Sequence, residues 1–356
     1  MRTSGPQPRA LQTEPIVADG GELIISAPHI TQISVIGHHY LSRARTHHDE
    51  TSMMKRLHAD EVHIEADLVR QLVRTQMPDM ANLKLRPVLA PGTDNLVFRL
   101  GPELSVRLPR KPSAVRSLLI EREWLPRMAS RLPLAVPLPV ASGEPSDAYP
   151  VPWLVCTWVH GTPLPPGGWL ASDDVDALVE FIVALQAFDT TGGPLVQPGQ
   201  RAGPVAAYDA TARTALEEAS LLKASGRIEA GFFDEEKAVS IWHAAVEAAP
   251  WEVPGVWVHR DLQGDNLVTV DGRLSGVLDF GGLAVGDPAG NVMAAFHLFS
   301  PESRSRFRAA IGADDATWTR ARGWALTQGL EALPYYLDTH PGMVAMARQV
   351  IQATLR

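Results

Sequence analysis

The segment HRDLQGDN at residues 259–266, followed by LDFG at residues 278–281, decides the fold of this chain. Three of its side chains with oxygen atoms are candidates for chemistry: Asp261, Asn266 and Asp279. Between the last two, the apolar runs NLVTV and SGVLDF flank an Asp-Gly-Arg turn signal. We therefore predict a strand, a turn and a second strand that return Asp279 beside Asn266.

These three side chains match what phosphoryl transfer requires. The reaction needs a carboxylate that accepts or orients the proton of the attacking hydroxyl, and hard oxygen ligands for one or two Mg²⁺ ions that bridge the phosphates. The alternative is an ordinary polar loop with turn residues at Asp265 and Asp271. The combination of an eight-residue motif with a downstream Asp-Phe-Gly favours the catalytic interpretation.

Composition limits the class of protein. With 356 residues and 45% hydrophobic content, the chain can bury a large core, and its length suggests two lobes around a cleft. The net charge of -8 argues against nucleic-acid binding and favours a cationic ligand. Cys156 is the only cysteine, so no intrachain disulfide can form, which is typical of a cytoplasmic protein. No run of about 18 apolar residues indicates a membrane span.

Hydrophobic periodicity predicts a small lobe that contains a sheet. The expected elements are a helix, the two strands of a hairpin, a second helix and a further strand, over residues 60–77, 96–100, 104–108, 113–129 and 151–159. Pro and Gly residues then mark a lobe boundary near 158–168.

Helical periodicity dominates the second lobe. We predict an insertion of three helices over residues 173–188, 207–224 and 234–249, with Asp173 or Asp174 as the N-cap of the first. Helices return after residue 291. Residues 1–52 are expected to be a flexible extension or the result of an overcalled start codon. The predicted domains are therefore 1–52, 53–160 for nucleotide binding, and 161–356 for catalysis and acceptor binding.

Residues 259–266 and 278–281 resemble the catalytic loop and the metal loop, respectively, of the protein-kinase-like superfamily. A protein kinase would continue into an activation segment that ends in Ala-Pro-Glu, but LDFGGLAVGDPAGN at 278–291 is similar to the Gly-x-Gly-Asp-Pro run of the aminoglycoside phosphotransferase family. Upstream segments also resemble that family: GTDNLVFRLG at 92–101, VRLPR at 106–110, IEREWLP at 120–126 and PWLVCTWVHG at 152–161. The resemblance implies an α+β, bilobal protein-kinase-like fold, with a small β-sheet N-lobe and a larger, mostly helical C-lobe with a helical insertion.

The resemblance also implies roles for individual residues. Asp261 would be the catalytic base, and Asn266 and Asp279 would hold Mg²⁺. Arg107 would contact the nucleotide phosphates, tethered by Glu121. Lysine is more usual than arginine at the first of these two positions, but a guanidinium can still bind phosphate bidentately.

Two further segments are expected to bind the nucleotide. The first hairpin strand is preceded by a turn that either cradles the phosphates or only starts the hairpin: Gly92, Thr93, Asp94 and Asn95. Thr157 and Val159 would hydrogen-bond the adenine through their main-chain groups. We expect Asp287 to be structural, and Arg260 to form a salt bridge or to be a surface charge.

The implied activity is transfer of the γ-phosphate of ATP or GTP, with Mg²⁺, to a hydroxyl of a small cationic molecule, foremost an aminoglycoside-type antibiotic. Alternatives are a kinase for another hydroxylated metabolite (an amino alcohol, homoserine or a sugar), a catalytically silent nucleotide-binding protein, and a protein kinase. The sequence does not indicate the acceptor hydroxyl, the choice between ATP and GTP, or the oligomeric state.

Overall fold

A computed structural model describes residues 16–18, 22–24, 64–88, 94–165 and 167–356, in two compact units divided after Met54. In the first unit, β1 (Ile16–Ala18) pairs with β2 (Glu22–Ile24) in antiparallel fashion. The rest of the predicted extension 1–52 lies outside the described residues, and its role stays a prediction.

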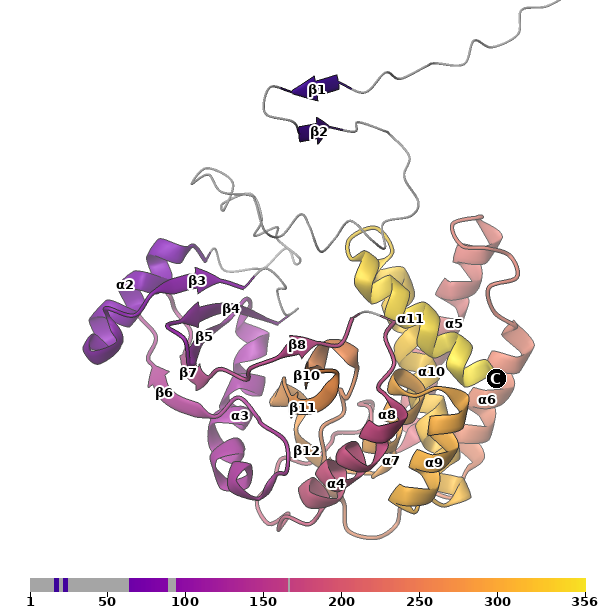
Figure 1. Ribbon diagram of the computed structural model, residues 1–356. Helices are drawn as coiled ribbons and strands as arrows, with labels where there is room; N and C mark the ends of the chain where they lie inside the picture. Colours follow the sequence, from indigo (N-terminus) through magenta and orange to yellow (C-terminus); the bar gives the residue numbers. More distant parts are fainter. Residues whose placement is uncertain (1–15, 19–21, 25–63, 89–93, 166) are drawn as a thin grey trace, which may run out of the picture. The chain divides into compact units, whose positions relative to one another are not determined.

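The N-lobe is built on a five-stranded antiparallel sheet in the order β3-β4-β5-β7-β6 (Figure 1). Alternation of apolar and polar residues produces the predicted hairpin of β4 and β5, in which buried Phe98 lies opposite buried Val106. The strands are β3 (Leu85–Pro87), β4 (Asn95–Leu100), β5 (Leu104–Pro109), β6 (Pro139–Gly143) and β7 (Trp153–Thr157).

Two helices accompany this sheet, α2 (Ala66–Gln76) and α3 (Val115–Met128). The described part of α2 has an apolar side on which Val69, Leu72 and Val73 are buried, as its helical spacing predicts. Helix α3 packs against β6 and β7 and also against the 3-10 helix Phe280–Gly282, which belongs to the second half of the chain. This helix therefore connects the N-lobe to the Asp-Phe-Gly segment.

Two small sheets carry the catalytic segment in the C-lobe, in the orders β11-β10-β8 and β12-β9. The predicted strand, turn and strand are present: Leu267 of β10 lies opposite Val277 of β11. The strands are β8 (Thr162–Pro163), β9 (Val256–Val258), β10 (Leu267–Val270), β11 (Arg273–Val277) and β12 (Ala284–Gly286).

Helices make up the remainder of the C-lobe (Figure 1). The longest of them, α10, packs against α5, α6, α7 and α11. No described helix is both long and apolar enough to cross a membrane. The helices are α4 (Val175–Gln186), α5 (Asp209–Ala224), α6 (Glu235–Glu247), α7 (Ala289–Val292), α8 (Ala294–Leu298), α9 (Pro301–Ile311), α10 (Asp315–Tyr336) and α11 (Pro341–Leu355).

The predicted capping of α4 is wrong in its chemistry. Asp174 occupies the N-cap position, but its side chain makes no capping hydrogen bond. Its backbone has φ -90° and ψ -1°, whereas a capping residue needs an extended conformation to reach the first turn. The carboxylate instead accepts a hydrogen bond from Arg273 Nε at 2.9 Å, so it ties α4 to β11.

Candidate active site

Amide groups hold both carboxylate oxygens of Asp261, which lies in the loop after β9. Asn266 Nδ2 donates to Oδ2 at 2.8 Å, and Gln328 Nε2 donates to Oδ1 at 3.1 Å. Gln263 Nε2 reaches Oδ2 at 3.4 Å. Burial raises the pKa of Asp261, and Asp279 adds to the rise, while Arg201 and the hydrogen bonds from Gln328 and Asn266 oppose it. These hydrogen bonds fix the orientation of the carboxylate, which makes Asp261 the candidate for a catalytic base in this loop.

His259 braces the loop as a neutral imidazole. Its Nε2 lies 3.0 Å from the carbonyl oxygen of Leu278, and its Nδ1 lies 3.3 Å from the backbone nitrogen of Asp261. A carbonyl accepts and an amide N–H donates, so the proton must be on Nε2. Burial lowers the pKa of His259 to about 4, which agrees with a neutral ring.

The β10–β11 hairpin returns Asp279 to the catalytic loop. The backbone nitrogen of Leu278 donates to the carbonyl oxygen of Asn266 at 2.8 Å, which joins the two segments directly. Asp279 adopts a left-handed conformation, with φ 57° and ψ 73°, and accepts a hydrogen bond from the Gly281 nitrogen at 3.3 Å. Its side chain remains 42% exposed, so it is available to a ligand.

The side chains of Asn266 and Asp279 fit a Mg²⁺ ion. Because Asn266 uses its amide nitrogen for Asp261, its Oδ1 remains as an acceptor. Among the described residues, no cluster of three or more His, Cys, Asp or Glu side chains forms a metal cage. Two protein oxygens suit Mg²⁺, which commonly keeps water ligands and phosphate oxygens.

Arg107 of β5 and Glu121 of α3 form a buried ion pair, with exposed fractions of 7% and 1%. Arg107 Nη2 also lies 3.9 Å from Asp279 Oδ1. Burial alone would lower the pKa of Arg107, but the neighbouring groups, Glu121 first and then Cys156 and Asp279, together outweigh burial, and the net pKa is raised. The guanidinium thus stays charged beside the Asp-Phe-Gly segment.

The expected phosphate cradle is described only in part. Gly92 and Thr93 lie outside the described residues. Asp94 forms an ion pair with Lys111 at 3.2 Å, and its carbonyl accepts a hydrogen bond from the Arg110 nitrogen at 2.8 Å. Asn95 is buried, and its Oδ1 has no hydrogen-bond partner among the described residues.

Thr157, the last residue of β7, and Val159 are the residues expected to bind the base. The Thr157 backbone nitrogen already donates to the Leu138 carbonyl at 2.8 Å, and its hydroxyl accepts from the Leu138 nitrogen at 2.9 Å. In the described part of the chain, the Val159 main chain makes no hydrogen bond. Of the two, Val159 has the main-chain groups free for a base.

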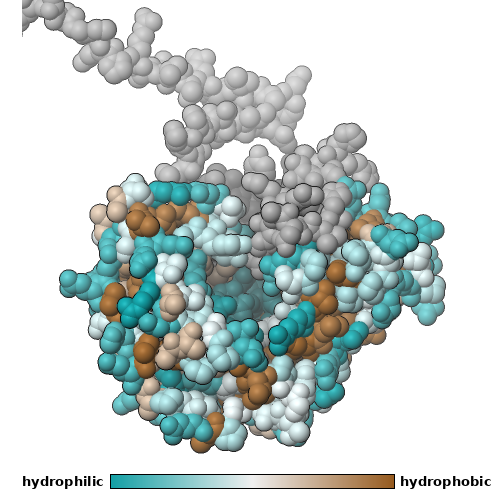
Figure 2. Space-filling model, turned by 180° about the vertical axis from the view of Figure 1, so that it is seen from behind, coloured by the Kyte–Doolittle hydropathy of each residue, from teal (hydrophilic) through white to brown (hydrophobic). Residues whose placement is uncertain are grey.

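A cavity of about 540 Å³ brings most of these residues together. Figure 2 shows a hollow in the described surface with mainly hydrophilic residues around it. Asp94, Asn95, Asp261, Asn266 and Asp279 line the cavity, whereas Arg107, Glu121, Thr157 and Val159 do not. Its further wall comes from the C-terminal helices and one loop residue: Gln328, Glu331, Ala332, Tyr335, Tyr336, His340, Met343 and Arg201.

Sequence reasoning missed this further wall. It placed acceptor binding within residues 161–356 but named no residue of this wall. The only available signal was the spacing of residues 328, 331, 332 and 335, which places them on one face of a helix. That spacing equally describes a buried face, so a single sequence could not distinguish the two.

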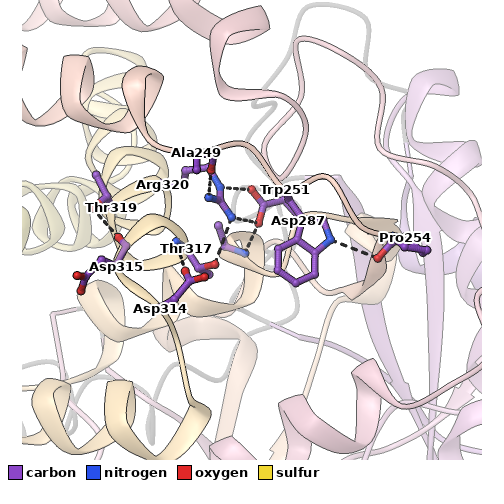
Figure 3. A network of polar contacts seen from close by, with 10 residues as sticks. Ala249, Trp251, Pro254, Asp287, Asp314, Asp315, Thr317, Thr319 and Arg320 are labelled. Atoms are coloured by element: carbon purple, nitrogen blue, oxygen red, sulfur yellow. Dashed lines mark hydrogen bonds and ion pairs between the residues drawn. The ribbon is translucent and has the colours of Figure 1, made fainter.

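The predicted structural role of Asp287 has a clear physical basis (Figure 3). Asp287 Oδ2 accepts a hydrogen bond from Arg320 Nε at 2.6 Å, and Asp287 Oδ1 accepts one from Arg320 Nη2 at 3.1 Å. The same guanidinium donates to the carbonyl of Ala249 and to Thr317 Oγ1. Asp287 also accepts a hydrogen bond from the Ala289 nitrogen at 2.9 Å. This buried network ties the end of the metal loop to α10.

We predicted a salt bridge or a surface charge for Arg260, but it is partly buried and forms no ion pair within the described part of the chain. Its Nε donates to the Gly282 carbonyl at 2.5 Å, and its Nη1 donates to Gln200 Oε1 at 3.2 Å. Burial, then the charge of Arg201, lowers the pKa of Arg260 to about 10. It therefore links the catalytic loop to the metal loop through backbone and amide acceptors.

Fold and site together define a class: a kinase-like phosphotransferase with a catalytic loop, a metal loop and an Arg-Glu pair. The model of the phosphotransferase enzyme family, APH, matches residues 86–324, about two thirds of the chain. The chain belongs to this family. It is therefore an enzyme, a small-molecule kinase with an alcohol group as acceptor. No curated protein sequence matches the chain significantly.

Solved structures agree on the fold at low sequence identity. Aminoglycoside 2'-phosphotransferase-IIIa, in complex with GDP, is 18% identical with a TM-score of 0.60, covering 81% of this chain and 97% of the other. A streptomycin-ATP-APH(2")-IIa ternary complex is 16% identical with a TM-score of 0.51 and coverages of 76% and 91%. Macrolide 2'-phosphotransferase MphH from Brachybacterium faecium is 20% identical with a TM-score of 0.51 and coverages of 80% and 97%. The predicted bilobal kinase-like fold is confirmed.

Proposed function

We propose that this enzyme transfers the γ-phosphate of a nucleoside triphosphate to a hydroxyl of a small molecule, with Asp261 as the catalytic base. One observation carries the proposal: Asp261, Asn266 and Asp279 line the same cavity, and an amide hydrogen bond joins the first two. The nucleotide is ATP or GTP, since solved relatives were crystallised with GDP and with ATP.

Each residue has a distinct task in this mechanism. Asp261 faces the acceptor hydroxyl, orients it and takes its proton as the bond to phosphorus forms. Asn266 and Asp279 would hold Mg²⁺, which supplies charge neutralisation on the phosphate oxygens when bound. Arg107, which is held by Glu121 and lies 3.9 Å from Asp279, would contact the nucleotide phosphates. Positioning accounts for most of the rate, because the transferred group needs little covalent assistance.

The acceptor that we propose first is an aminoglycoside-type antibiotic. The family assignment supports it, as do solved relatives whose names specify aminoglycosides and a complex with streptomycin. A second acceptor class is favoured by the described wall residues. Beyond the catalytic and metal loops, that wall has one carboxylate, Glu331, one guanidinium, Arg201, and the aromatic and apolar side chains of Tyr335, Tyr336 and Met343. Such a wall suits an acceptor with a single amine and a large apolar body, such as a macrolide.

A screen of nucleotide turnover tests the proposal. ATP and GTP would be tested with and without Mg²⁺ against aminoglycosides, macrolides, amino alcohols, homoserine and sugars, and products identified by mass spectrometry. We expect Mg²⁺-dependent phosphorylation of one class of hydroxylated amine. Nucleotide binding without turnover for any acceptor would instead indicate a catalytically silent protein. Labelling of protein substrates alone would indicate a protein kinase.

A further inference from the structure

Gln328 of α10 contacts Asp261, the proposed base, although the two residues are 67 positions apart in the sequence. Its Nε2 donates to Asp261 Oδ1 at 3.1 Å and to Gln263 Oε1 at 3.1 Å. Gln263 Nε2 in turn lies 3.4 Å from Asp261 Oδ2, which closes a ring of three side chains. Only one orientation of the Gln328 amide offers hydrogen atoms to both acceptors, so the ring fixes that orientation.

The helix that presents Gln328 is rigidly placed. Arg320, two turns earlier on α10, is bound to the buried Asp287 at the end of the metal loop (Figure 3). Trp324, Ala325 and Leu326 are fully buried beside it. A side chain on such a helix can position its partner, because its own backbone has little freedom to move.

The same face of α10 forms part of the far wall of the cavity. Gln328, Glu331, Ala332 and Tyr335 recur at spacings of three and four residues and all line the cavity. The same face of α10 therefore contacts Asp261 and would also contact the acceptor molecule in the cavity. A small shift of this face would change the distance between base and hydroxyl, and a misplacement of about 1 Å can cost on the order of 100-fold in rate.

We propose that Gln328 is a positioning residue that fixes the carboxylate of Asp261 relative to the acceptor wall. The inference rests on the proposed function, because it presumes that Asp261 is the base. Two other groups act on Asp261 through their charges: Arg201, from the loop before α5, and Asp279, from the metal loop. Neither offers the directional contact to Oδ1 that Gln328 provides.

Steady-state kinetics of three variants test the inference, with ATP and the acceptor found in the screen, or water as acceptor through intrinsic ATP hydrolysis. Gln328→Met keeps the length of the side chain but removes the donor. We expect kcat to fall about 10- to 100-fold while KM for ATP changes by less than about threefold. Gln328→Glu is nearly isosteric and places a carboxylate against Asp261, so we expect a lower kcat than for Gln328→Met.

Gln349→Met provides the matched control. Gln349 is also a half-buried amide and donates one hydrogen bond, to the His297 carbonyl at 3.2 Å, but it does not line the cavity. We expect its kcat to equal that of the wild type. The inference is overturned if Gln328→Met keeps the wild-type kcat or if the kcat of Gln328→Glu exceeds that of Gln328→Met. It is also overturned if KM for ATP rises by the same factor as kcat falls. Undiminished turnover in Asp261→Asn would instead refute the proposed function itself, so the two failures are distinguishable.

Discussion

Arg320→Met tests whether the contact between α10 and the metal loop stabilises the fold. The substitution removes a guanidinium that is 3% exposed and donates two hydrogen bonds to Asp287, which is 7% exposed. Asp287 would keep only the Ala289 nitrogen as a donor on Oδ1, and Oδ2 would lose its only donor among the described residues. Removing one partner of a buried pair costs about 3–5 kcal/mol. We expect a loss near 3 kcal/mol, because Oδ1 retains one donor.

Urea unfolding followed by tryptophan fluorescence measures this loss. Arg322→Met is the matched control on the same helix. Among the residues that the structure describes, Arg322 donates a single hydrogen bond, to the Thr354 carbonyl at 2.6 Å, and we expect a loss of about 1 kcal/mol for its removal. The double variant Arg320→Met with Asp287→Asn should recover about 1–2 kcal/mol relative to the sum of the single variants, because no uncompensated charge stays buried. A loss below about 1 kcal/mol for Arg320→Met, or strictly additive effects, would refute this reasoning.

Arg107→Lys keeps a cation opposite Glu121 and should retain turnover within about tenfold. Arg107→Met should raise the nucleotide KM by more than about tenfold in steady-state assays. Equal KM values for the two variants would contradict the assignment of Arg107 to the nucleotide phosphates. Burial lowers the pKa of His297 to about 3, so the unfolded chain binds a proton that the fold does not, and stability falls as the pH drops below about 6.5. His297→Leu should flatten the curve of unfolding free energy against pH between about 6.5 and 4, and an unchanged slope would count against this account. Glu331→Gln should raise the KM of a cationic acceptor about tenfold at nearly constant kcat. As a control, substitution of the exposed Glu217 by Gln should leave this KM unchanged. The same KM in both variants would show that Glu331 does not bind the acceptor.

Much of the fold could be predicted because local patterns and tertiary structure agree. The β4–β5 hairpin follows from largely alternating apolar and polar residues around a Gly-Pro turn, and the β10–β11 hairpin follows from two apolar runs around Asp-Gly. The capping role of Asp174 could not be predicted correctly, because the distant Arg273 binds its carboxylate. That contact joins two residues that are 99 positions apart in the chain, which no local pattern encodes.

The residues of the site also fall into those that the sequence could predict and those that it could not. Asp261, Asn266 and Asp279 come together through short loops and one hairpin, so their sequence spacing was sufficient to predict that they meet. Gln328 is 67 residues from Asp261 along the chain, and its contact depends on how α10 packs. No motif marks a glutamine in a helix as a partner of a carboxylate. Residues of this kind can be found only once the fold is known.

The rate of γ-phosphate transfer by Asp261→Asn tests the central claim most directly. Radiolabelled nucleotide and Mg²⁺ would be used in a single turnover, with Asp271→Asn, in the exposed turn between β10 and β11, as the matched control. The account predicts that Asp261→Asn slows transfer by about 100- to 10,000-fold while nucleotide affinity is kept, and that the control transfers at the wild-type rate. Transfer by Asp261→Asn at close to the wild-type rate would contradict the account.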